Sequence, residues 1–317
     1  MSSPADKFAL TLDDGALKVP LHRFAHEAMN TIFGVSILGA AADCAQSAAR
    51  LAFEKVDRLE QLLSRFIEGS DVWRINHLAP GSWTPVDADT LKCLQLAQTL
   101  TEQTNGAFDI TIGPLQNWWR QNDTPDQSAA DFNAAAVRTG MDLLEINEQA
   151  HGVGVRTDGV QIDLGGIGKG YAVDQMIQLL KEQDIENALT HGGQSTIFAM
   201  GAIPEHPGWP MIITNPEQPT KPWKKLYVSN QSISGSGVQI QGPHIIDPRS
   251  CQLARDKSRA YARADSATRA DALSTAFMIM SLDEIETYCQ HHQNTGAIIA
   301  LQEQGECCMK KIGVLKH

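Results

Sequence analysis

The order of helical and strand-like patterns along the chain is the feature that most restricts its fold. Segments with apolar residues at helical spacing and segments with alternating apolar residues follow each other without a regular βαβα order. This irregular order favours an α+β fold with mixed sheets and flanking helices over a doubly wound parallel sheet. The 317 residues are also enough to bury a large core.

Four segments carry the helical pattern, and the first has apolar residues and charges on opposite faces. The predicted helices cover residues 41–66, 89–103 and 169–181, and a last one starts near Asp271. Strand-like patterns are expected over residues 107–119, broken by Gly113-Pro114, and over 153–164, with a turn at Asp158-Gly159. Shorter strands are expected around Ala188, Ile197, Met211 and Tyr227 and in the tail.

Composition excludes several classes of function. The formal net charge is -11 and no run of Lys or Arg exists, which argues against a nucleic-acid partner. None of the six cysteines belongs to a CxxC pair, so a zinc site is not expected. An acidic protein that binds a phosphate-rich ligand must rely on a metal ion and on backbone amides.

The N-terminal residues show no basic start, no apolar stretch of signal length and no cleavage site. No segment reaches the roughly 18 uncharged apolar residues that a membrane helix needs. As the sequence stands, we expect a cytoplasmic protein without stable membrane insertion. A periplasmic location is expected instead if a leading segment is missing.

The glycine-rich segment QIDLGGIGKGYAVD, residues 161–174, runs from a strand-like pattern into a predicted helix. Backbone N–H groups at such a helix start can face an anion, and glycines let the backbone approach a ligand closely. Lys169 adds a positive charge suited to a phosphate. The spacing fits neither standard nucleotide motif, so the segment is either a binding turn or a tight strand-to-helix connection.

In the segment RADALSTAFMIM, Asp271 and Thr275 are four residues apart, which places both side chains on one face of a helix. A carboxylate and a hydroxyl are hard oxygen ligands that suit magnesium or calcium. The alternative is structural, with Asp271 near the helix start, where its charge meets the positive end of the dipole.

Three further segments have both a functional and a structural interpretation. In GPHIIDPRS, His244 is a candidate acid or base, because histidine changes charge near neutral pH. The segment SISGSG, residues 232–237, is either a phosphate-contacting loop or a plain turn, and we favour the turn. In GAFDITIGPL, Phe108 and Asp109 either contact a flat ring or belong to the core.

The order of these motifs resembles the FAD:protein FMN transferase family, also called the ApbE family. The resemblance rests on LLSRF, SDVWRIN, GAFDITIGPL, DLGGIGKGYAVD, HIIDPR and ADALSTA. The resemblance implies a single catalytic domain over residues 1–317. Residues from about 28 to 290 carry the resemblance, and residues 1–27 form an N-terminal extension. It also implies a two-lobed fold with a ligand cleft between the lobes.

The resemblance further implies a role for particular residues. Asp271, Thr275 and the carbonyl of Gly166 would bind magnesium. His244 and Asp271 would be catalytic, and which of the two takes a proton stays open. FAD, as the substrate, would contact Phe33, Phe66, Ala107, Phe108, Asp109, Asp163, Lys169 and Ile245.

The implied reaction moves the FMN half of FAD onto a Thr or Ser hydroxyl of an acceptor protein and releases AMP. The alternatives are a magnesium-dependent FAD pyrophosphatase and a non-catalytic flavin-binding protein. The chain departs from the family pattern where Cys251 replaces a glycine after the DPR turn.

Overall fold

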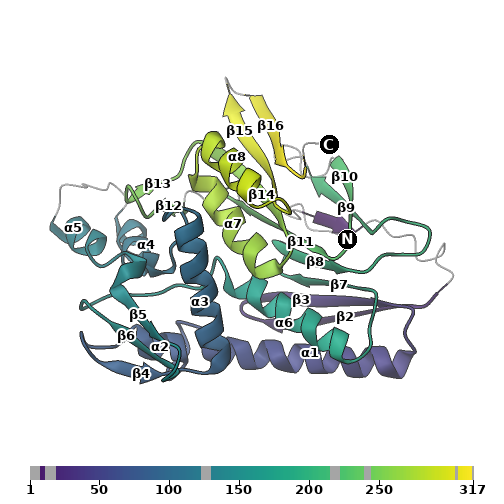
Figure 1. Ribbon diagram of the computed structural model, residues 1–317, viewed down its shortest axis with the longest axis horizontal. Helices are drawn as coiled ribbons and strands as arrows, with labels where there is room; N and C mark the ends of the chain where they lie inside the picture. Colours follow the sequence, from purple (N-terminus) through teal and green to yellow (C-terminus); the bar gives the residue numbers. More distant parts are fainter. Residues whose placement is uncertain are drawn as a thin grey trace.

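The computed structural model describes residues 8–10, 19–122, 130–214, 222–238, 244–303 and 306–315. Helices and strands alternate irregularly, and the fold is an α+β arrangement of several sheets and flanking helices in two lobes, as predicted (Figure 1).

An eight-stranded antiparallel sheet forms the larger lobe, in the order β16-β15-β14-β11-β8-β7-β3-β2. Helices α1, α6 and α7 cover one face of this sheet and bury a single large apolar core against it (Figure 1). The strands are β2 (Leu21–Ala28), β3 (Thr31–Leu38), β7 (Ala188–Gly192), β8 (Thr196–Met200), β11 (Gln231–Gly237), β14 (Lys257–Ala264), β15 (Gly296–Glu303) and β16 (Glu306–Gly313). The helices of this lobe are α1 (Ala42–Leu63), α6 (Gly168–Glu182), α7 (Ala267–Ile279) and α8 (Leu282–His291).

A three-stranded sheet covers the other face of the large sheet. Its strands are β1 (Phe8–Leu10), β9 (Trp209–Thr214) and β10 (Pro222–Val228). Trp209 and Met211 of β9 pack on Leu189, Tyr261 and other residues of the large sheet, forming a second core.

The smaller lobe is built from residues 71–155 around a second three-stranded sheet (Figure 1). It contains α2 (Asp71–Ile75), β4 (Trp83–Pro85), α3 (Ala88–Gln103), a 3-10 turn (Ile110–Ile112), α4 (Gly113–Gln121), α5 (Ala130–Ala136), a second 3-10 turn (Met141–Leu143), β5 (Leu144–Asn147) and β6 (Gly152–Val155). The short hairpin β12 (Ile246–Asp247) and β13 (Gln252–Leu253) packs against α4 through Ile246.

Three predictions about local structure were wrong. Residues 107–119 form no strand, because Asp109 caps a 3-10 turn and Pro114 starts α4. The segment SISGSG is strand β11 and not a turn. The strand pattern predicted over residues 153–164 ends early, at Val155, although the turn predicted at Asp158-Gly159 is present. Asp271 lies in the second turn of α7, and Ser266 is the capping residue at its N-terminus.

No helix among the described residues is both long enough and apolar enough to cross a membrane.

Candidate active site

The residues before the glycine-rich turn, 160–164, belong to no helix or strand in the described part of the chain. The side chain of Asn76, at the C-terminus of α2, forms two hydrogen bonds with the backbone of Ile162. The Ile162 N–H donates to Asn76 Oδ1 at 2.7 Å, and Asn76 Nδ2 donates to the Ile162 carbonyl at 3.0 Å. The Asp163 N–H donates to the Ile110 carbonyl at 2.7 Å. One side-chain amide and a few backbone bonds therefore fix the approach to the turn.

Asp163 closes the start of that turn. Its Oδ1 accepts from the Gly165 N–H at 2.7 Å, and its Oδ2 lies 3.1 Å from Arg65 Nη1. Arg65 is mostly buried and lies 4.9 Å from the ring centroid of Phe66, which is itself 81% exposed. Arg65 thus places a positive charge beside the turn, a role that the sequence did not single out.

Helices α6 and α7 approach each other closely just after the turn. A Cβ added at Gly170 would stand 2.3 Å from the Ala267 carbonyl oxygen, so only glycine fits there. Asp174 of α6 accepts from the backbone N–H groups of Ala267 and Thr268 at 2.7 and 2.8 Å. Its carboxylate therefore satisfies free donors at the N-terminus of α7 and fixes that helix against α6.

Asp271 is buried at this helix contact, with 4% of its surface exposed. Its Oδ2 accepts from the Gly170 N–H at 3.0 Å. Its Oδ1 accepts from Thr196 Oγ1 at 2.8 Å and from Ser234 Oγ at 3.1 Å. A buried carboxylate needs such donors, and here they come from α6, β8 and β11.

Two of the predicted metal ligands, Gly166 and Thr275, are neighbours, and the third lies one helical turn from Thr275. Thr275 lies one turn beyond Asp271 on α7, and a Cβ added at Gly166 would stand 3.3 Å from Thr275 Oγ1. The same Cβ would also stand 3.3 Å from the ring of Phe108. The structure thus brings Gly166 and Thr275 into contact, next to one of the predicted flavin-contacting residues.

A group of hydroxyls beside this site was missed by the sequence interpretation. Ser236 Oγ lies 2.7 Å from Ser274 Oγ and 3.3 Å from Thr275 Oγ1. The detectable signal was the period of two in Ser232, Ser234 and Ser236, which indicates one face of a strand. We name Thr196, Ser234, Ser236 and Ser274 the hydroxyl cluster.

Lys169, in the first turn of α6, is the cation nearest to Asp271 among the ion pairs found in the described residues. Its Nζ donates to the Gly165 carbonyl at 2.7 Å and lies 3.7 Å from Asp271 Oδ2. The ammonium group therefore lies between a backbone oxygen and a carboxylate oxygen.

The other predicted flavin-contacting residues lie in varied surroundings. Phe33 is fully buried, and its ring would be 2.9 Å from a Cβ added at Gly192. Ala107, Phe108 and Ile245 are also buried in the main core. The Asp109 carboxylate accepts from the Thr111 N–H at 2.7 Å and from the Met141 N–H at 3.0 Å. Burial raises the pKa of Asp109, and these hydrogen bonds oppose that effect.

His244 is exposed and directly precedes Ile245 at the start of the β12–β13 hairpin. The first two residues of GPHIIDPRS lie outside the described residues. Whether His244 and the flavin-contacting set act as expected stays a prediction.

The candidate metal ligands differ from one metal ion to another in how well they suit it. Gly166, Asp271 and Thr275 offer oxygen atoms and no sulfur or nitrogen, which suits a hard divalent cation. Within the described ranges, no group of three His, Cys, Asp or Glu residues could hold a metal ion. The residues therefore fit magnesium held with one carboxylate, and do not fit a zinc centre.

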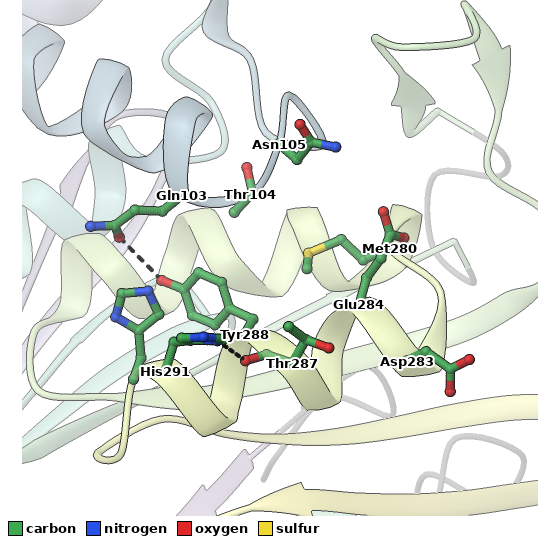
Figure 2. Close-up of a pocket in the computed structure, with 10 residues that line it drawn as sticks. Gln103, Thr104, Asn105, Met280, Asp283, Glu284, Thr287, Tyr288 and His291 are labelled. Carbon is green, nitrogen blue, oxygen red and sulfur yellow. Dashed lines mark hydrogen bonds between the residues drawn. The ribbon is translucent and has the colours of Figure 1, made fainter.

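A pocket of about 440 Å³ lies between the C-terminal end of α3 and α8 (Figure 2). Tyr288 Oη lies on its floor and donates to Gln103 Oε1 at 3.4 Å, and Arg269 Nη1 donates to the same oxygen at 2.8 Å. None of the predicted site residues lines this pocket. Its lining residues are Gln103, Thr104, Asn105, Met280, Asp283, Glu284, Thr287, Tyr288, His291 and His292.

Solved structures with the same fold are flavin transferases. The flavin transferase ApbE from Vibrio cholerae superposes with a TM-score of 0.83 at 21% identity, covering 94% of this chain and 99% of that one. The Pseudomonas stutzeri flavinyl transferase ApbE in its apo form gives a TM-score of 0.82 at 24% identity, covering 94% and 96%.

Curated relatives carry one name. A FAD:protein FMN transferase of Klebsiella pneumoniae is 27% identical over 276 residues, which cover 81% of this chain and 78% of the relative. The FAD:protein FMN transferase of Salmonella typhimurium is 25% identical over 299 residues, covering 88% and 83%. The profile of the ApbE family matches residues 29–299, and the chain therefore belongs to the ApbE family.

Proposed function

We propose that this protein transfers the FMN half of FAD onto a Thr or Ser hydroxyl of an acceptor protein and depends on magnesium for the reaction. The observation that carries the proposal is the arrangement at the glycine-rich start of α6, where Gly166 lies next to Thr275 and Lys169 lies 3.7 Å from Asp271, one turn before Thr275 on α7. Family membership and the names of the curated relatives support the same reaction.

FAD would lie along the glycine-rich turn. Gly165 and Gly166 leave the backbone open to a pyrophosphate, and Lys169 supplies the charge that phosphate oxygens need. The remaining contacts would come from Asp163 and from Ala107, Phe108 and Asp109, with Phe33, Phe66 and Ile245 at further positions.

The reaction forms one bond and breaks another. The acceptor oxygen attacks the phosphorus of the FMN half, the P–O bond to the AMP phosphate breaks, and AMP leaves with the electron pair. Most of the barrier is charge that builds up on phosphoryl oxygens, so positioning and nearby positive charge lower it. Magnesium bound by Gly166, Asp271 and Thr275 would supply part of that positive charge.

The proton of the attacking hydroxyl must go to a base. Asp271 is a poor candidate, because the Gly170 N–H and the hydroxyls of Thr196 and Ser234 already donate to its two oxygens. His244 is exposed at the start of the β12–β13 hairpin, where an acceptor protein can reach it. We therefore assign the proton transfer to His244.

The test incubates the protein with FAD, magnesium and a peptide that carries a Thr or Ser in a candidate flavinylation motif. Flavin fluorescence on the peptide supports transfer. Free FMN and AMP without labelled peptide would show that the protein is a pyrophosphatase and not a transferase. Unchanged FAD would mean that the protein only binds flavin.

Asp271→Asn should lower the transfer rate by about 100-fold or more, because the variant loses the charged metal ligand but keeps the side-chain shape. Asp265→Asn is the matched control, since Asp265 is an exposed carboxylate just before α7. Rates are measured with folding verified by circular dichroism. A wild-type rate in Asp271→Asn would refute the assigned metal site.

A further inference from the structure

We propose that Lys169 and the divalent ion alternate at one place beside Asp271, so that the metal must displace the ammonium group before the site can work. The inference rests on the metal site of the proposed function. It adds a role for Lys169 that is distinct from contact with FAD.

The first argument is the position of the ammonium group. Lys169 Nζ lies between the Gly165 carbonyl oxygen, at 2.7 Å, and Asp271 Oδ2, at 3.7 Å. A backbone carbonyl next to a carboxylate is the kind of oxygen pair that a magnesium ion uses. The protein's own cation therefore lies against Asp271, a predicted metal ligand, and against the carbonyl of the residue that precedes Gly166, another predicted ligand.

Second, hydrogen-bond donors fill most of the lone-pair positions of the Asp271 carboxylate. An ionised carboxylate offers about four lone-pair positions. Oδ1 accepts from Thr196 and Ser234, and Oδ2 accepts from the Gly170 N–H. The remaining position faces Lys169, whose contact at 3.7 Å is an ion pair without a hydrogen bond. It is the contact that costs least to replace.

The third argument is electrostatic. Two cations that share one carboxylate oxygen repel each other strongly in a partly buried site, so the ammonium group and a divalent ion exclude each other. The Lys169 side chain is 26% exposed, and solvent gives the released ammonium group room to turn away. Once displaced, it is free to pair with an anionic ligand. Metal binding would thus prepare Lys169 for a phosphate.

The experiment measures Mn²⁺ affinity in the absence of FAD, by electron paramagnetic resonance or calorimetry, for the wild type and three variants. Lys169→Met should bind Mn²⁺ about tenfold more tightly, because the competing cation is gone. Lys181→Met removes the same charge from the far end of α6 and should match the wild type. Asp271→Asn should lose the site.

A second measurement follows the lysine directly. In crystals loaded with Mn²⁺, Lys169 Nζ should lie beyond about 3.5 Å from the Gly165 carbonyl oxygen, outside hydrogen-bond distance. An ammonium group that keeps this bond with the ion in place would overturn the inference.

The outcomes separate the two proposals. Equal or weaker Mn²⁺ binding by Lys169→Met, together with loss in Asp271→Asn, would refute the alternation and leave the metal site standing. Equal tightening in Lys181→Met would also refute it, because the effect would then be one of overall charge. Absence of Mn²⁺ binding in the wild type would remove the metal from the proposed function and the alternation with it.

Discussion

Cys251 has a backbone conformation that glycine adopts more easily. Its φ is 61°, in the left-handed region. The Cys251 N–H donates to the Asp247 carbonyl at 2.7 Å, which closes the turn and holds the residue in place. The turn therefore keeps its shape at the cost of local strain.

Replacing Cys251 tests this strain. Cys251→Gly should be more stable than Cys251→Ala by about 1 kcal/mol, because both variants lose the sulfur but only alanine keeps the left-handed penalty. Urea denaturation measures the two free energies of unfolding. Equal values would mean that the turn stores no strain at this residue.

At the scale of elements, the contact between α6 and α7 determines where Asp271 lies relative to the glycine-rich turn. Gly170→Ala should destabilise the fold by about 1–3 kcal/mol, because its Cβ would stand 2.3 Å from the Ala267 carbonyl oxygen and 2.8 Å from Asp271 Cβ. Gly168→Ala is the matched control on the same helix, since its nearest contact would be Leu164 Cβ at 3.7 Å. Thermal unfolding compares the two, and similar losses would argue against a close helix contact.

The sequence predicts an element well when its hydrogen-bond partners are close in the sequence, and poorly when they are distant. Helices α1, α3 and α6 were predicted within a few residues, because their apolar spacing decides them locally. The segment around Ile162 was predicted as part of a strand, but the Asn76 amide and two backbone bonds to residues 110–113 hold it without forming one. No local pattern reveals such a partner.

The candidate site shows the same division. The sequence identified Asp271 and Thr275 from their spacing on one helix. The donors that surround Asp271 come from Gly170, Thr196 and Ser234 on three separate elements, and only the fold brings them together. Motifs therefore pointed to the two candidate side chains, and only tertiary structure shows the groups that surround Asp271.

At the scale of the molecule, charged pairs connect segments that are distant in the sequence. Arg249 in the β12–β13 turn pairs with Glu284 of α8 at 2.7 Å. Partial burial acts to raise the pKa of Glu284, but hydrogen bonds from the Ser281 N–H and from Arg249 outweigh it and leave that pKa lowered. The folded carboxylate therefore stays ionised to lower pH than it does in the unfolded chain.

The lowered pKa of Glu284 determines how the free energy of unfolding changes with pH. A carboxyl group whose pKa is lowered by folding contributes stability above its unfolded pKa, near 4.5, and loses it as the pH falls through the folded value. Arg249→Met should therefore destabilise the protein at pH 7 and have a smaller effect near pH 3. Urea denaturation at both pH values measures this, and Arg50→Met, which removes an exposed arginine paired within α1, is the control. A loss that is independent of pH would contradict the role of the pair.

The Asn76 amide that brackets Ile162 has a mechanical consequence. Because this side chain belongs to the end of α2 and holds both polar groups of Ile162, the small lobe and the chain leading to Gly166 share one rigid link. A shift of α2 would therefore move Ile162 and the glycine-rich turn that follows it. The small lobe is thus coupled to the position of Gly166, which we propose as a metal ligand.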